Sequence, residues 1–207
     1  KSDNKIYYLY IAFSFVFIAV TTNYLSLYDI IFVANQTDSL SYTAIAKNAP
    51  LLSGENFFIL NNKETLIAQH VAQRFVIPYI IGSIAHFLNV DFFLIFKLFT
   101  LIFILFYIFL INILIKKLNF NLKVSILFFS ILFLNPYIIR YHIFQPVHAH
   151  DMLFFCFGLL FFLTMINKNY FSNLLISIIA IYLRQTSIAL LIGSSIFLLI
   201  NKKIKLF

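Results

Sequence analysis

Long apolar runs alternate with short polar segments along almost the whole chain. The runs at about 6–28, 98–115, 122–139 and 152–167 each approach the roughly 20 apolar residues that a helix needs to cross a bilayer. A bilayer core offers no water to backbone polar groups, so such runs are expected to be helical. The alternating pattern of a membrane barrel does not occur in the sequence. The pattern predicts an all-α integral membrane protein.

Two further apolar stretches are less regular. The stretch 170–200 contains the polar sequence "RQT" at 184–186, which predicts two short spans separated by a break. The run "FVIPYIIGSIAHFL" at 75–88 contains Pro78 and Gly82 and is short for a span. Its length alone does not distinguish a helix that crosses the membrane from one that lies along its surface.

The distribution of charge decides between these alternatives. With 75–88 on the membrane surface and the N-terminus in the cytoplasm, the cytoplasmic segments hold nine lysines and one acid. The other side then holds six basic and six acidic residues, so the net charge of +8 falls on the cytoplasmic side. This bias collapses if 75–88 spans the membrane. We therefore predict about six transmembrane helices, cytoplasmic termini for this segment and no nucleic-acid partner.

The resulting first extracytoplasmic loop, 29–97, is long, and long loops are commonly functional. Its pattern predicts a short helix near 38–48, a turn around 53–62, and a helix from about 64 to 88. The second helix is apolar enough to lie in the membrane interface. The predicted organisation is one transmembrane domain over 1–207 with amphipathic interfacial helices in this loop.

The polar segment "NQTDSLSYTAIAKNAP" contains the first candidate for catalysis. Asp38, Tyr42 and Ala46 follow one another at helical spacing and therefore share a face. Asp38 also has the position of a helix N-cap, which is the interpretation that periodicity alone favours. Asp29 is the rival acid because it lies closer to the first span, but it lacks partners at helical spacing.

The second outer loop, "NPYIIRYHIFQPVHAHD", holds another concentration of polar side chains. His148, His150 and Asp151 offer ligands for a divalent metal, with Asp38 as a further candidate, since imidazole and carboxylate suit Zn²⁺. The His-x-His spacing is a weak signal, because both rings face one side only in an extended segment. The plain alternative is a polar loop in which Asp151 caps a helix that starts at Met152.

The order of these parts forms a characteristic series. An anchor helix precedes "DSLSYTAIA", and an interfacial helix with a proline follows. Lys97 then opens a span that ends in a lysine pair, the next span ends in Asn-Pro, and Asp151 heads the following one. This series resembles the N-terminal half of the C-type (GT-C) glycosyltransferase superfamily. Its members are polyprenyl-phosphate-sugar-dependent membrane enzymes such as protein O-mannosyltransferases and lipid A aminoarabinose transferases.

The resemblance implies roles for individual residues. Asp38 would act as general base on an acceptor hydroxyl that attacks the anomeric carbon, with inversion and departure of polyprenyl phosphate. Asp151 would be the second acid of the active site, and cations would stabilise the phosphate. For each cation the plain alternative is a snorkelling interfacial side chain, although a charge in an apolar stretch, as at Arg184, is commonly functional. The substrate-binding candidates are Tyr42, Arg74, Lys97, Arg140, Arg184, His148 and His150.

Two other functions compete with the enzyme. A transporter or flippase fragment would place charges within its spans, whereas here the acids gather in the outer loops, which favours the enzyme. A non-catalytic membrane subunit is the other alternative. Members of the resembled family are longer, and this chain begins with Lys1, so we expect the N-terminal portion of a longer multi-pass protein of the bacterial cell membrane.

Overall fold

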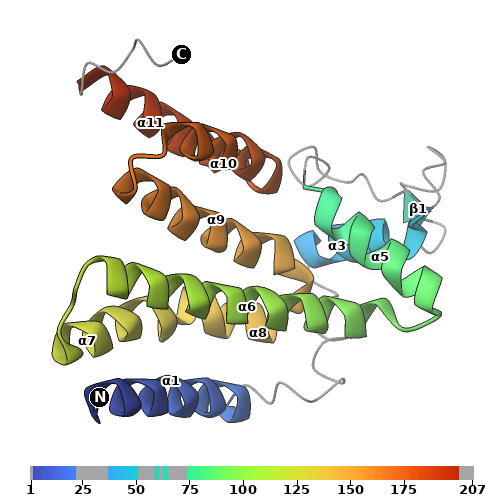
Figure 1. Ribbon diagram of the computed structural model, residues 1–207. Helices are drawn as coiled ribbons and strands as arrows, with labels where there is room; N and C mark the ends of the chain where they lie inside the picture. The colour runs from blue at the N-terminus through green and yellow to red at the C-terminus, as the bar shows by residue number, and fades with distance from the viewer. Residues whose placement is uncertain (1, 22–36, 51–58, 61–62, 65–73, 201–207) are drawn as a thin grey trace.

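The structure is a computed structural model of the 207-residue chain and describes residues 2–21, 37–50, 59–60, 63–64 and 74–200. The described part is almost entirely helical (Figure 1), which confirms the predicted class. Two short strands, β1 (Ile59–Leu60) and β2 (Lys63–Glu64), pair antiparallel near the predicted turn.

The helices follow the apolar runs with shifted boundaries. In chain order they are α1 (Ser2–Thr21), α3 (Thr37–Asn48), α5 (Val76–Leu88), α6 (Phe92–Lys117), α7 (Leu122–Phe133), α8 (Tyr141–Phe144), α9 (Ala149–Ile166), α10 (Tyr170–Leu183) and α11 (Ile188–Ile200). A π-helical turn (Pro136–Arg140) and two 3-10 turns (Pro146–His148 and Gln185–Ser187) connect several of them.

The helix predicted from about residue 64 begins at Val76 as α5, since Glu64 belongs to β2 and Arg74 lies in a turn.

Two further boundaries differ from the sequence pattern for local reasons. The run 122–139 is interrupted after Phe133, because Pro136 lacks an N–H group and disfavours helical geometry at Asn135. Helix α6 begins at Phe92, where Asp91 accepts a hydrogen bond from the Phe93 N–H, so Lys97 lies inside this helix and does not open it. The predicted break at 184–186 is confirmed by the 3-10 turn between α10 and α11.

Two stretches of the described chain are long and apolar enough to cross a membrane, α6 and Pro146–Ile166. A third is obtained if α7 and Ile138–Phe144, bent by 41° at their junction, are counted as one span. Lys5–Val20 and Tyr170–Leu183 are shorter apolar helices. A helical membrane protein with two or three such spans is therefore the architecture established by length and composition.

The helices form a layered bundle with a small helical cap at one end. Helices α1, α6, α7, α9, α10 and α11 run roughly along one another, whereas α3 and α5 lie together at the end where α6 and α9 begin (Figure 1). The main core lies among α1, α6, α7 and α9 and includes Ile111, Phe129 and Met152. A second cluster, which includes Ile81 and Phe96, joins the cap to the bundle.

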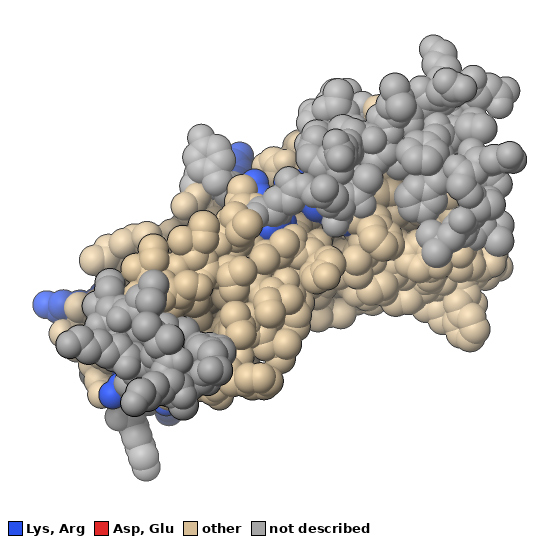
Figure 2. Space-filling view, turned by 90° about the horizontal axis from the view of Figure 1, so that it is seen from above, with Lys and Arg blue, Asp and Glu red and all other residues tan. Residues whose placement is uncertain are grey.

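The outer surface of the bundle is rich in apolar side chains. Leu9, Phe109, Leu127 and Phe171 each expose more than half of their surface. Seen from above, the described surface is mostly free of charged residues, with basic side chains at one end and near the middle (Figure 2). Apolar exposure over several neighbouring helices is expected for a protein whose solvent is lipid.

Candidate functional site

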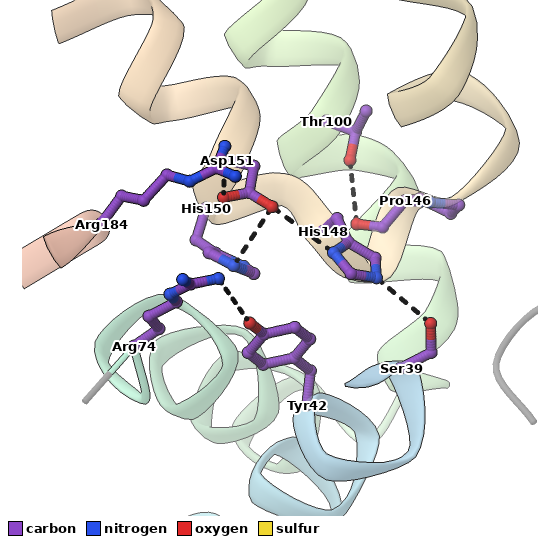
Figure 3. Close-up of polar contacts among 9 residues, drawn as sticks. All are labelled: Ser39, Tyr42, Arg74, Thr100, Pro146, His148, His150, Asp151 and Arg184. Atoms are coloured by element: carbon purple, nitrogen blue, oxygen red, sulfur yellow. Dashed lines mark hydrogen bonds and ion pairs between the residues drawn. The ribbon is translucent and has the colours of Figure 1, made fainter. Parts of the chain in front are cut away.

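The candidate site starts at the N-terminus of α9. His148 closes the preceding 3-10 turn and occupies the N-cap position, and Asp151 lies in the first turn of the helix. This helical start places His148 Nδ1 3.5 Å from Asp151 Oδ2, and His150 Nε2 lies 3.6 Å from the same oxygen (Figure 3). A carboxylate in a first helical turn also interacts favourably with the helix dipole.

Arg184 reaches Asp151 from a different helix. It follows the last residue of α10 in an extended conformation, with φ −156° and ψ 125°. Its Nη1 lies 3.6 Å from Asp151 Oδ1, and its guanidinium carbon lies 5.8 Å from the centre of the Phe154 ring. The two oxygens of Asp151 therefore face different partners, the imidazoles on one side and the guanidinium on the other.

Helix α3 covers the histidines. Ser39 Oγ lies 3.3 Å from His148 Nε2. The Tyr42 ring is fully buried, and its centre lies 5.2 Å from that of His148 and 4.3 Å from that of His150. Arg74, which precedes α5, donates from Nη1 to the Tyr42 hydroxyl over 3.4 Å. Side chains from segments far apart in the sequence thus belong to one cluster.

The cluster is buried and incompletely hydrogen-bonded. His150 is 1% exposed, and His148 and Asp151 are 7% exposed. Within the described part of the chain, neither ring nitrogen of His150 has a hydrogen-bond partner, and neither does Asp151 Oδ1. Buried polar groups are normally paired, because leaving one without a hydrogen bond costs about 1–3 kcal/mol. Unused hydrogen-bonding capacity in such a place is typical of a group that binds a ligand.

The donor set fits a divalent metal. Ligand atoms of His148, His150 and Asp151 lie within 4.8 Å of one another. Two imidazoles and one carboxylate suit Zn²⁺ and related ions, and three protein ligands leave a coordination position for water or substrate. The Ser39 hydroxyl contacts His148 Nε2, as a hydrogen-bonding partner does when it orients a metal-binding imidazole from outside the ligand set. These three residues are the candidate metal ligands.

The structure brings most of the predicted residues together, but it does not place all of them in the cluster. Lys97 is buried in α6 one turn before Thr100, whose hydroxyl donates to the Pro146 carbonyl over 3.1 Å. Arg140 is exposed, and among the described contacts none joins it to the cluster. Asp38 belongs to α3 and directly precedes Ser39, but its side chain lies outside the described part, as does all of Asp29.

Both capping interpretations from the sequence need correction. Helix α9 begins at Ala149, three residues before the expected start, so Asp151 lies inside its first turn and does not cap it. The 3-10 turn Pro146–His148 leads directly into this earlier start of the helix, and His148 takes the N-cap position. Helix α3 begins at Thr37, so Asp38 likewise lies within the first turn of its helix. The two imidazoles converge although the segment is not extended.

Two buried polar residues could not be identified from the sequence pattern. Ser39 was overlooked beside Asp38, although it makes the contact with His148. His142 is 2% exposed, and in the described structure neither of its ring nitrogens has a hydrogen-bond partner. The centre of its ring lies 5.1 Å from that of Tyr141 and 5.8 Å from that of Phe155. The available signal was a histidine in the apolar part of the segment 135–151.

Comparisons with known proteins add no relative to this picture. No family model, no curated protein and no solved structure matches the chain. Function is therefore inferred from the cluster itself and from the resemblance in the order of sequence segments.

Proposed function

We propose that this chain is the catalytic membrane portion of a glycosyltransferase that moves a sugar from a polyprenyl-phosphate donor to an extracytoplasmic acceptor. The observation that carries the proposal is the contact between the two outer loops. Ser39 and His148 are 109 residues apart in the sequence, yet their side chains meet. The resemblance assigns acids from these same two loops to one active site, and the loops need to meet for that chemistry.

The proposed topology has six spans. These are α1, α6, the bent α7–α8 pair, α9, α10 and α11, with both ends of this segment in the cytoplasm. The cluster and the α3–α5 cap would then lie on the extracytoplasmic side, and 29–97 would be the first outer loop. The lysines at the opposite ends of α6 and α9 agree with the positive-inside tendency.

Different residues would act on the acceptor and on the leaving phosphate. Asp38 would take the proton of the acceptor hydroxyl while its oxygen bonds to the anomeric carbon and the bond to the phosphate oxygen breaks, which inverts the configuration. Arg184 and Arg74 would stabilise the negative charge of the departing polyprenyl phosphate, for which guanidinium groups are suited. A divalent ion held by His148, His150 and Asp151 would supply further positive charge beside that phosphate.

The decisive experiment compares lipid-linked sugars in cells with and without the gene. We expect the polyprenyl-phosphate donor to accumulate in the deletion strain and to return to its normal level when the wild-type full-length protein is restored. An Asp38→Asn variant should be produced in the membrane and fail to restore it. Asp91→Asn is the matched control, because Asp91 is an exposed acid of the same loop that caps α6.

Two results would overturn the proposal. Unchanged lipid-linked sugars in the deletion strain would remove the donor assignment. Full restoration by the Asp38→Asn variant would remove Asp38 from the role of general base, whatever the donor is. Restoration by the Asp91→Asn variant is expected, since its carboxylate contacts only the start of α6 in the described structure.

A transporter or flippase is the second candidate, and one observation favours it. The break between α10 and α11 places Arg184 within an apolar stretch, and interrupted helices with a charge at the break are typical of transporters. Reconstituted vesicles distinguish the two functions. Movement of a lipid-linked sugar between leaflets without transfer to an acceptor would favour the transporter.

A further inference from the structure

A cavity of about 480 Å³ lies at the end of the bundle opposite to the cluster of His148, His150 and Asp151. It is formed by the first part of α1, the last turns of α6, the α6–α7 connection and the start of α7, which lie together in Figure 1. The polar residues in its wall include Tyr7, Tyr8, Asn112, Lys116, Asn119 and Asn121. The candidate active site uses none of them.

Several of these groups are donors. Lys116 is exposed in the last turn of α6. Tyr7 is 7% exposed, and its hydroxyl has no hydrogen-bond partner within the described part of the chain. Asn121 accepts a hydrogen bond from the Val124 N–H with its Oδ1. This bond does not use its Nδ2 group, which is a donor. None of the described residues in the wall is acidic. The wall is therefore suited to an anion.

The start of α7 adds to this preference. Asn121 is the N-cap of this 12-residue helix, and Leu122 is its first residue, and both line the cavity. Helix N-termini carry partial positive charge and bind phosphate and carboxylate groups. The lysine, the phenol hydroxyl and the helix start thus act on the same space, and the binding chemistry is that of a phosphate group.

The surroundings favour a lipid as the source of that phosphate. Ile115, Phe120 and Leu122 form the apolar part of the wall. Elsewhere on two of the helices that form the cavity, Leu9 on α1 and Leu127 on α7 expose most of their surface, as expected of helices that face lipid in the proposed membrane arrangement. A headgroup in the cavity would leave its acyl chains along this apolar surface. The lysine-rich end of the bundle is also the end that the charge distribution assigns to the cytoplasm.

We propose that this cavity binds the phosphate headgroup of an anionic phospholipid in the cytoplasmic leaflet. The occupant is a phosphatidylglycerol-type lipid, with the phosphate facing Lys116, Tyr7 and the start of α7. The proposal does not rest on the glycosyltransferase function, because the cavity lies at the other end of the bundle.

Native mass spectrometry of the full chain tests the proposal. The purified protein is offered phosphatidylglycerol or phosphatidylcholine in equal amounts, and retained lipid is counted after removal of detergent. We expect selective retention of phosphatidylglycerol. Lys116→Gln should reduce retention of phosphatidylglycerol roughly five-fold more than Lys117→Gln does. Roughly five-fold is the affinity that one lysine contributes at an anionic lipid surface. Lys117 is the matched control, because it is the next residue of α6 but donates to Asn167 and is absent from the cavity wall.

Tyr7→Phe provides an independent variant that removes only the hydroxyl, and it should also lower selective retention. Size-exclusion profiles and melting temperatures identify any variant that fails to fold, in which case the other variant decides. Equal retention of both lipids, or equal effects of Lys116→Gln and Lys117→Gln, would overturn the proposal. Displacement of the bound lipid by millimolar inorganic phosphate would also overturn it, since the site would then select free phosphate.

Discussion

The Ser39 hydroxyl lies 3.3 Å from Nε2 of His148, although 109 residues separate the two along the chain. This contact joins helix α3 to the start of α9, where His150 and Asp151 complete the cluster. Asp38, the proposed general base, directly precedes Ser39 in α3.

Ser39→Ala should weaken metal binding by roughly ten-fold, since loss of a hydrogen-bonding partner to a metal-bound imidazole typically has an effect of this size. The measurement is zinc affinity of the purified protein by competition with a fluorescent chelator. Ser195→Ala is the control, because Ser195 is exposed on α11 and donates to the Leu191 carbonyl. Equal affinity in the wild type and the Ser39→Ala variant would show that this hydroxyl has no part in the site.

His150→Ala should abolish retention of a divalent metal after dialysis, because one of the three ligands is lost. Wild-type retention should fall as the pH is lowered, since imidazole and carboxylate bind metal only when deprotonated. Elemental analysis of the dialysed protein measures both effects. His86→Ala is the control, because His86 is exposed on α5. Wild-type protein that retains no metal at neutral pH would exclude the proposed metal site.

Gly82→Ala should destabilise the α3–α5 cap. A Cβ atom at position 82 would lie within 2.6 Å of the Ala46 Cα, and neither helix backbone has room to move without loss of packing. Overpacking of this kind costs about 1–3 kcal/mol. Loss of the cap should release α3 from His148, so we expect a lower melting temperature together with weaker metal binding.

Gly158→Ala is the matched control for this variant. A Cβ atom at position 158 would meet nothing within 4 Å, and alanine favours the helix over glycine by roughly 0.5–1 kcal/mol. Its melting temperature should therefore be equal to or above that of the wild type. A Gly82→Ala variant that is as stable as Gly158→Ala would contradict the close packing of α5 against Ala46.

Arg184→Gln should lower the stability of the protein and weaken binding of a polyprenyl-phosphate donor. The substitution leaves the Asp151 carboxylate without its guanidinium partner. The expected loss is about 1–2 kcal/mol, below that of a fully buried pair, because the Arg184 side chain is 35% exposed. Thermal unfolding and lipid-donor binding measure the two effects.

Arg140→Gln serves as the comparison for Arg184→Gln, because it removes the same charge from an exposed position. We expect little change in stability from this substitution. Similar losses in both variants would mean that net charge, and not the pairing with Asp151, determines the effect.

The proposed topology is tested by cysteine labelling in a Cys156→Ala background. A cysteine at position 55 should react with a membrane-impermeant maleimide in intact cells, whereas one at position 168 should react only after permeabilisation. The reason is that the charge distribution places the first on the extracytoplasmic side and the second in the cytoplasm. The opposite pattern would invert the topology and would move the cluster to the cytoplasmic face.

Much of the secondary structure could be predicted because it depends on neighbouring residues. Apolar runs indicated the helices, and the polar sequence at 184–186 indicated the break between α10 and α11. The helix at Thr37–Asn48 was also predicted within one residue. Helix ends were less accurate, because the start of α9 depends on a 3-10 turn whose geometry has no periodic signal.

The sequence indicated most residues of the candidate site but not which of them contact one another. The sequence alone predicted that acids, histidines and arginines gather in the polar segments between the helices of a membrane protein, since hydropathy and charge are properties of each segment. Only the tertiary structure decided that Arg184 pairs with Asp151, that Arg74 contacts Tyr42, and that Arg140 stays outside the cluster. Such pairs come from different helices, so they depend on how those helices pack, and spacing along the chain carries no record of that packing.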